Sequence, residues 1–177
     1  MTQYWFPDTT VLCNFASVES LPLLRQVLDG RGRWVEAIAH EVAKSVRFHP
    51  SLACVERDGW LREPIEITDP NDIRQIERVR RSALGGPPDE PLKHLGEAQT
   101  CHVILRNDAF ADSVWITDDR DASDHARFQG IRARDTMDLV SEAVACGYVT
   151  RTDGYRLLTE IADQDRYLRL PRRPADL

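Results

Sequence analysis

Short apolar runs and helical patterns follow one another from the start of the chain. The aromatic run at residues 3–7 includes a proline at its end, which predicts a short buried strand. Apolar residues then recur at helical spacing through residues 12–16 and again through residues 21–28, where Gly30 is placed to end the second helix. Residues 34–37 predict another brief strand. The pattern therefore indicates strands separated by helices.

The middle of the chain is less regular. An apolar stripe predicts a helix over residues 38–46, which ends before the X-Pro step at Pro50. Between residues 51 and 90 we expect a helix over residues 69–83, followed by a loop rich in glycine and proline. This loop is too short to be a domain linker. We therefore expect one domain over residues 1–177, with a helical insertion around residues 51–90.

The second half shows the same alternation more clearly. A helix over residues 96–105 precedes a buried strand over residues 114–116. The remaining expected elements are a short helix over residues 123–129, a strand edge at Ile131, and amphipathic helices over residues 136–146 and 153–162, the last capped by Thr152. Short strands that alternate with helices predict an α/β fold with a parallel sheet between helical layers.

The charge of the chain is unevenly distributed. The 177 residues include 23 Lys and Arg against 29 Asp and Glu, a formal net charge of −6. Six aspartates and Arg120 fall within residues 107–125, so this window carries −5 and the rest of the chain only −1. A globally acidic surface would argue against a nucleic-acid partner, but a local concentration of acid does not.

Other features narrow the class of protein. No apolar run approaches the ~20 residues that a membrane span needs. The start of the chain lacks the basic and apolar regions of a secretory signal, so we expect a cytoplasmic protein. The chain has four cysteines, which are Cys13, Cys54, Cys101 and Cys146. No two of them form a C-x2-C pair, which argues against a zinc knuckle and favours a role as small buried hydrophobic residues.

Acidic residues stand at the ends of two predicted strands. Asp8 comes directly after the strand at residues 3–7, and Asp118 and Asp119 follow closely after the strand at residues 114–116. In open parallel sheets, ligands bind beyond the carboxyl ends of the strands. We therefore expect these carboxylates to line one crevice.

Two glutamates lie on helices that face the same core. Glu41 shares a helical face with Ile38 and Val42, and Glu97 shares one with Cys101 by i+4 spacing. Carboxylates gathered in a partly desolvated crevice repel one another until their pKa values rise or a cation neutralises them. Oxygen-only ligands select Mg²⁺ or Mn²⁺ rather than zinc, and such ions activate water and stabilise the leaving oxygen of a phosphodiester. The constellation therefore predicts metal-dependent phosphodiester hydrolysis.

Each acid has a simpler interpretation when it is taken alone. Asp8 is suited to cap the first helix. The two glutamates are suited to solvated helix positions, and the aspartates at residues 118–121 to a helix N-terminus. The joint placement, at two strand ends and two core-facing helix positions, favours the metal site.

Arginine, which supplies 21 of the 23 basic residues, is the candidate partner for a phosphate chain. Clusters at residues 78–81 and 169–173 are candidates for phosphate contacts, with solvated surface as the alternative. His94, Glu97 and His102 suggest a zinc site by proximity in sequence. However, Glu97 and His102 are about 140° apart around a helix, which is poor chelating geometry.

The acidic segments carry a resemblance to PIN-domain nucleases. Residues 6–12, Phe-Pro-Asp-Thr-Thr-Val-Leu, resemble the opening of that family, in which an aspartate ends the first strand. Residues 39–42, 95–98 and 116–122 resemble the segments that carry the second, third and fourth acids, and the match runs from about residue 3 to residue 165. The resemblance implies a three-layer α/β/α fold and a Mg²⁺- or Mn²⁺-dependent endoribonuclease, commonly the VapC-type toxin of a toxin–antitoxin pair.

The resemblance also implies roles and partners. Asp8, Glu97 and Asp119 are expected to bind the metal directly, and Glu41 to hold a metal-bound water or a second ion, so that these four acids are the catalytic set. Asp118 remains an alternative fourth ligand because the doubled aspartate allows two alignments. The implied partners are RNA as substrate, a small antitoxin protein and a second copy of the chain. A PIN-fold nuclease that is not a toxin and a catalytically idle interaction module remain the alternatives.

Overall fold

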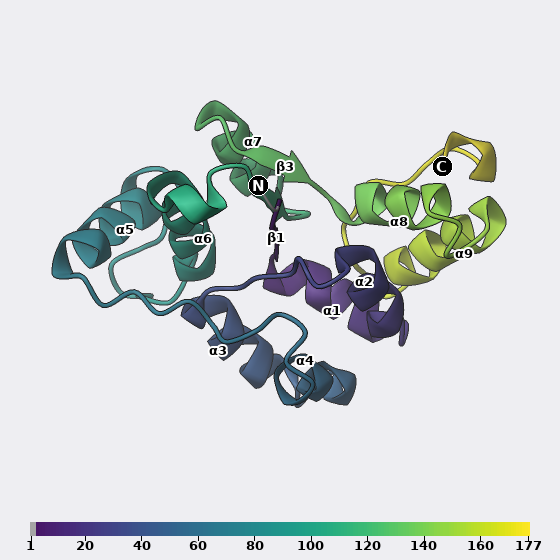
Figure 1. Ribbon diagram of the computed structural model, residues 1–177, viewed down its shortest axis with the longest axis horizontal. Helices are drawn as coiled ribbons and strands as arrows, with labels where there is room; N and C mark the ends of the chain where they lie inside the picture. Colours follow the sequence, from purple (N-terminus) through teal and green to yellow (C-terminus); the bar gives the residue numbers. More distant parts are fainter. Residues whose placement is uncertain (1–2) are drawn as a thin grey trace.

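The computed structural model describes residues 3–177, and a three-stranded parallel sheet runs through its centre (Figure 1). The strands are β1 (Trp5–Pro7), β2 (Val114–Ile116) and β3 (Arg132–Arg134). They pair in the order β1-β2-β3, with Pro7 opposite Ile116 and Ile116 opposite Arg134. Because all strands run the same way, their carboxyl ends meet at one edge of the sheet.

Burial of the strands follows from their sequences. All three residues of β1 and of β2 are buried, as expected for parallel strands covered on both faces. In contrast, β3 reads Arg-Ala-Arg, is exposed or half-buried, and forms an edge of the sheet. Large side chains of the strands belong to the hydrophobic core, among them Trp5, Phe6 and Trp115, each at most 2% exposed.

Helices cover the sheet from both sides. In Figure 1, α5 and α6 lie to one side of the strands, and α8 and α9 lie to the other. The α-helices of the described chain are α1 (Thr9–Ser17), α2 (Leu21–Leu28), α3 (Glu36–Ser45), α4 (Ala53–Arg57), α5 (Pro70–Ser82), α6 (Leu95–Arg106), α7 (Arg120–Phe128), α8 (Thr136–Ala145) and α9 (Arg151–Ala162). The expected α/β class with a central parallel sheet is therefore confirmed. None of these helices has the length and apolar character needed to cross a bilayer.

Three local expectations were wrong, and each has a physical reason. The strand expected at residues 34–37 is reduced to one bridge between Val35 and Ile65, because α3 already begins at Glu36. The helix α7 begins at Arg120 rather than at residue 123, because the side chain of Asp119 caps it. The cap of α9 is Thr150 rather than Thr152: the Asp153 amide donates to Thr150 Oγ1 over 3.1 Å.

Arg80 is fully buried, which the arginine cluster at residues 78–81 did not predict. Its guanidinium donates to the Glu77 carboxylate at 2.7 and 2.8 Å. It also donates to the backbone carbonyls of Pro87, Glu90 and Lys93 at 3.0 to 3.3 Å. Arg80 therefore fixes the loop between α5 and α6 and is not available to bind phosphate.

Candidate metal centre

Asp8 lies at the carboxyl end of β1, where its amide donates to the carbonyl of Ile116 over 2.8 Å. It precedes α1, but its side chain makes no capping hydrogen bond to that helix, so the capping interpretation lacks its usual contact. The residue is only 5% exposed. Burial raises the pKa of Asp8 well above its usual value, and the charges of Glu97, Glu41 and Asp119 raise it further.

Glu41 and Glu97 approach Asp8 from two helices. Glu41 lies on α3 and accepts a hydrogen bond of 2.6 Å at Oε2 from the Thr9 hydroxyl. Glu97 lies in the first turn of α6, and its Oε1 is 3.1 Å from Nδ1 of His94. Burial raises the pKa of Glu41, the Thr9 hydrogen bond offsets part of the shift, and the Glu97 charge adds to it. The three carboxylates therefore share one electrostatic environment.

Gly96 permits the close contact between α3 and α6 that brings the glutamates together. A Cβ atom at this position would lie 2.3 Å from Ile38 Cδ1 and 3.3 Å from Glu41 Oε1. The first distance is shorter than a nonbonded carbon contact allows. Gly96 thus has a packing role, because α6 lies against α3 only where no side chain intervenes.

We expect Gly96→Ala to lower the free energy of unfolding by about 1–3 kcal/mol, because the new methyl group must displace Ile38 or separate the helices. Urea denaturation measures this change. The matched control is Thr152→Ala at an exposed position of α9, where we expect a change within about 0.5 kcal/mol. Equal stability of Gly96→Ala and the wild type would show that the close approach is unnecessary.

Asp118 is occupied by hydrogen bonds from the protein. Its Oδ1 accepts from the Thr136 amide at 2.9 Å, and its Oδ2 accepts from the Thr136 hydroxyl at 2.5 Å and from Asn14 Nδ2 at 2.8 Å. Burial raises the pKa of Asp118, and the Thr136 hydrogen bonds offset part of that shift. These contacts join the end of β2 to α1 and to the first turn of α8, which is a structural role.

Asp119 is exposed, and only one of its two carboxylate oxygens accepts a hydrogen bond from the described residues. Its Oδ1 accepts from the Ala122 amide at 2.8 Å, which caps α7, and its own amide donates to Thr117 Oγ1 at 3.1 Å. Its Oδ2 has no hydrogen bond within the described residues, and its charge contributes to the raised pKa of Asp8. Asp119 lines two hollows of about 590 and 460 Å³. Of the two adjacent aspartates, Asp119 is the one with a carboxylate oxygen open to a ligand.

Asp8 therefore lies within electrostatic range of Glu41, Glu97 and Asp119, and Glu41 lies within range of Glu97. Among the described residues, neither lysine nor arginine forms an ion pair with any of them, and His94 is the single basic partner. No group of three or more His, Cys, Asp or Glu side chains within residues 3–177 forms a ready-made metal cage. Their chemistry fits Mg²⁺ or Mn²⁺ nonetheless, because Mg²⁺ usually binds through one or two carboxylates and keeps several waters.

Several supporting residues were not predicted from sequence. Asn14 is fully buried and Thr136 is fully buried, yet both are polar and both bind Asp118. A polar residue inside an apolar helical stripe was the available signal for Asn14, since a buried polar group needs a partner. Thr9 contacts Glu41 across 32 positions of the chain, which no sequence spacing indicated. His94 contacts Glu97 at i,i+3 spacing, which the sequence had associated only with a zinc site.

The zinc alternative is not supported by the positions of the histidines. His94 lies beside Glu97, whereas His102 Nε2 is 3.1 Å from Asp72 Oδ1 on α5. The two imidazoles therefore serve different acids on different elements, and they do not converge on one point.

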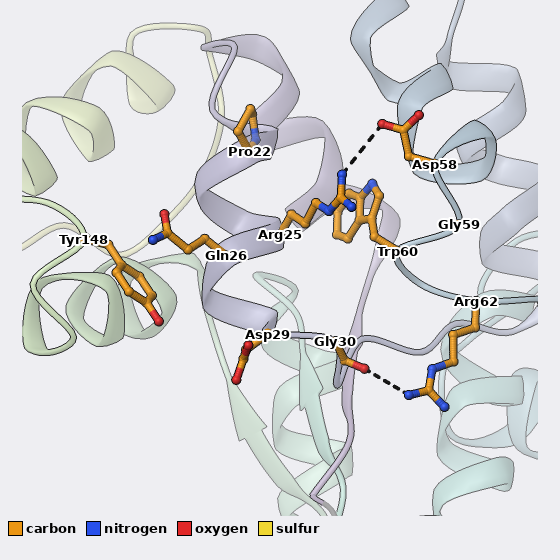
Figure 2. Close-up of a pocket in the computed structure, with 10 residues that line it drawn as sticks. All are labelled: Pro22, Arg25, Gln26, Asp29, Gly30, Asp58, Gly59, Trp60, Arg62 and Tyr148. Atoms are coloured by element: carbon orange, nitrogen blue, oxygen red, sulfur yellow. Dashed lines mark hydrogen bonds and ion pairs between the residues drawn. The ribbon is translucent and has the colours of Figure 1, made fainter.

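A separate hollow of about 580 Å³ lies at the other end of β1 (Figure 2). It is lined in part by Gly30, and the next residue, Arg31, accepts a hydrogen bond at its carbonyl from the amide of Trp5, the first residue of β1. Figure 2 shows the Arg25–Asp58 ion pair of 3.8 Å across this hollow. The hollow is therefore distinct from the carboxylate site at the end of the strands.

Comparison with known proteins identifies the family. Searches of curated proteins and of solved structures each found no match. A family model described as a PIN domain matches residues 5–171, which is almost the whole chain. The fold agrees with the resemblance found in the sequence. The chain therefore belongs to the PIN-domain nuclease family.

Proposed function

We propose that the protein is a divalent-metal-dependent endoribonuclease that hydrolyses RNA phosphodiester bonds with Mg²⁺ or Mn²⁺. The observation that carries this proposal is the buried Asp8 carboxyl group, which lies among three further carboxylates without a lysine or arginine partner in the described chain. Such an arrangement is unfavourable in its fully ionised form unless a cation joins it. A multivalent cation is therefore the missing partner that the charge distribution favours.

The residues take distinct roles in this proposal. Asp8, Glu97 and Asp119 would hold the ion, and a bound divalent ion lowers the pKa of water and stabilises charge on the leaving oxygen. The Thr9 hydroxyl fixes Glu41 Oε2 at 2.6 Å, which leaves Oε1 to orient the attacking water. Burial raises the pKa of Glu41, which makes this carboxylate a better proton acceptor than an exposed glutamate. Asp118 would hold the strand end in place through Thr136 and Asn14.

The choice of RNA and the role as a toxin rest on the sequence resemblance to VapC-type proteins. In that role, the partners would be a small antitoxin protein, which covers the acidic crevice, and a second copy of the chain. The toxin proposal predicts that induced expression of the wild-type protein arrests growth and that the Asp8→Asn variant does not. Normal growth with an active nuclease would favour a PIN-fold nuclease outside toxin–antitoxin systems.

The metal dependence has a direct test. Purified protein is expected to cleave single-stranded RNA with Mg²⁺ or Mn²⁺ and to lose all cleavage in EDTA, since the ion supplies the water activation. Gel analysis of an end-labelled RNA measures cleavage, and re-addition of Mn²⁺ to the EDTA sample should restore it. Cleavage that persists at full rate in EDTA would contradict the proposed function.

A further inference from the structure

The chain that follows α9 passes along the carboxylate site. Asp165, Arg166 and Tyr167 line the hollow of about 460 Å³ that also contains Asp119. Tyr167 additionally lines the neighbouring hollow of about 590 Å³. The segment therefore contributes a carboxylate, a cation and an aromatic ring next to the proposed metal ligand.

Arg166 provides a positive charge that no carboxylate of the described chain neutralises. Its Nη2 lies 2.8 Å from Nε2 of His49, and a guanidinium can only donate in this contact. Burial and the nearby guanidinium lower the pKa of His49, which favours the neutral imidazole. Burial raises the pKa of the Cys13 thiol, and the Arg166 charge offsets part of that shift while the charges of Asp8 and Glu41 add to it. Arg166 and these two acids therefore act on the same thiol.

The other arginines that line these hollows have acidic partners. Arg169 forms ion pairs with Asp135 and Asp138. Arg120 and Arg127 both lie close to Asp124, at 3.9 and 3.4 Å. Carboxylates of the protein therefore partly neutralise the positive charge of these three arginines. Arg166 is the better candidate for a phosphate, because a guanidinium that is not paired with a carboxylate keeps its attraction for an external anion.

Tyr167 presents an aromatic ring to solvent beside this cation. The residue is 84% exposed, although tyrosine usually buries most of its ring. An exposed aromatic ring in a nucleic-acid site provides a face on which an unpaired base can stack. Bases in a duplex are already stacked and paired, so this contact selects a single strand.

We propose that Arg166 and Tyr167 form a subsite for single-stranded RNA next to the carboxylate cluster, in which Arg166 contacts a backbone phosphate and Tyr167 stacks on the adjoining base. This inference rests on the proposed function. It adds the residues that hold the single-stranded substrate outside the metal site.

Fluorescence anisotropy with a labelled single-stranded RNA of about 12 nucleotides tests the stacking contact in EDTA, where the proposed cleavage is absent. We expect Tyr167→Ala to weaken binding at least about fivefold, the lower limit for loss of one stacked base. Tyr167→Phe keeps the ring and should bind like the wild type. Tyr148→Ala, in the separate hollow of Figure 2, is the matched control and should also leave binding unchanged.

The salt dependence of RNA binding tests the phosphate contact of Arg166. We expect Arg166→Gln to reduce the slope of log affinity against log salt by about 0.7, the value for one phosphate contact on a single strand. Arg166→Lys should restore the slope because it keeps the charge. Restoration by lysine separates a phosphate contact from a role limited to holding His49, since Lys presents a different hydrogen-bond geometry.

Three results would overturn the subsite. The first is a Tyr167→Ala variant that binds the RNA with wild-type affinity. The second is a Tyr167→Phe variant whose affinity falls as much as that of Tyr167→Ala. The third is a Tyr167→Ala variant whose affinity falls equally for the single strand and for the same RNA annealed to its complement. Circular dichroism establishes that the exposed substitution leaves the protein folded. A subsite that passes these tests in a protein that cleaves no RNA with any divalent ion would refute the proposed activity alone, so the two failures are distinguishable.

Discussion

Asp8→Asn is expected to reduce metal-dependent RNA cleavage by about a thousandfold or more while leaving the protein folded. Asparagine has nearly the same shape as aspartate, but its neutral amide is a much poorer ligand for Mg²⁺ than a carboxylate. Asp8 is also the acid on which the charges of Glu97, Glu41 and Asp119 converge. Cleavage rates at saturating Mg²⁺ measure the loss, and a variant that cleaves at the wild-type rate would refute the assignment of Asp8.

The same substitution should make the metal-free protein more stable at neutral pH. Because the folded-state pKa of Asp8 is raised, its contribution to stability is complete below the unfolded pKa of about 3.9 and is lost as pH rises through the folded value. Asparagine does not ionise, so the variant does not lose this stability as the pH rises. In EDTA, the melting temperature of Asp8→Asn should therefore exceed that of the wild type at neutral pH and approach it in acid. Added Mg²⁺ should raise the melting temperature of the wild type more than that of the variant.

Asp119→Asn and Asp118→Asn are expected to separate catalysis from stability. Asp119→Asn should lose cleavage by about a hundredfold or more but keep the wild-type free energy of unfolding, because asparagine caps a helix about as well as aspartate. Asp118→Asn should lower the free energy of unfolding by at least about 2 kcal/mol, because its amide group would face donors from Thr136 and Asn14.

Urea denaturation and cleavage assays on the two variants form one matched experiment. The change is the same in both, and the positions are adjacent. The reverse pattern, with full stability and no cleavage in Asp118→Asn and full cleavage in Asp119→Asn, would make Asp118 the fourth ligand.

Much of the arrangement could be predicted from sequence because it depends on local periodicity and on one rule of topology. The buried strands β1 and β2 read as short apolar runs, and parallel strands place their carboxyl ends together. This rule placed Asp8 near the aspartates that follow β2. The helical stripes of α3 and α6 likewise directed Glu41 and Glu97 toward the core.

The remainder depends on tertiary contacts that sequence spacing does not encode. Asp118 and Asp119 are neighbours in sequence, and only the positions of Asn14 and Thr136 distinguish the occupied carboxylate from the open one. Arg80 resembles its surface neighbours in the sequence, yet it is buried because three carbonyls of the following loop converge on it. Arg166 contacts His49, 117 positions earlier in the chain, and no local spacing predicts this pairing.

A Mn²⁺-soaked crystal of the wild-type protein would test the metal centre most directly, through an anomalous difference map. We predict a peak at the carboxyl end of β1 and β2, about 2.0–2.3 Å from carboxylate oxygens of Asp8 and at least one of Glu97 and Asp119. The peak should disappear in Asp8→Asn crystals soaked in the same way. A fully soaked wild-type crystal with no peak at these carboxylates, or with a peak that persists in Asp8→Asn, would contradict the proposed metal centre.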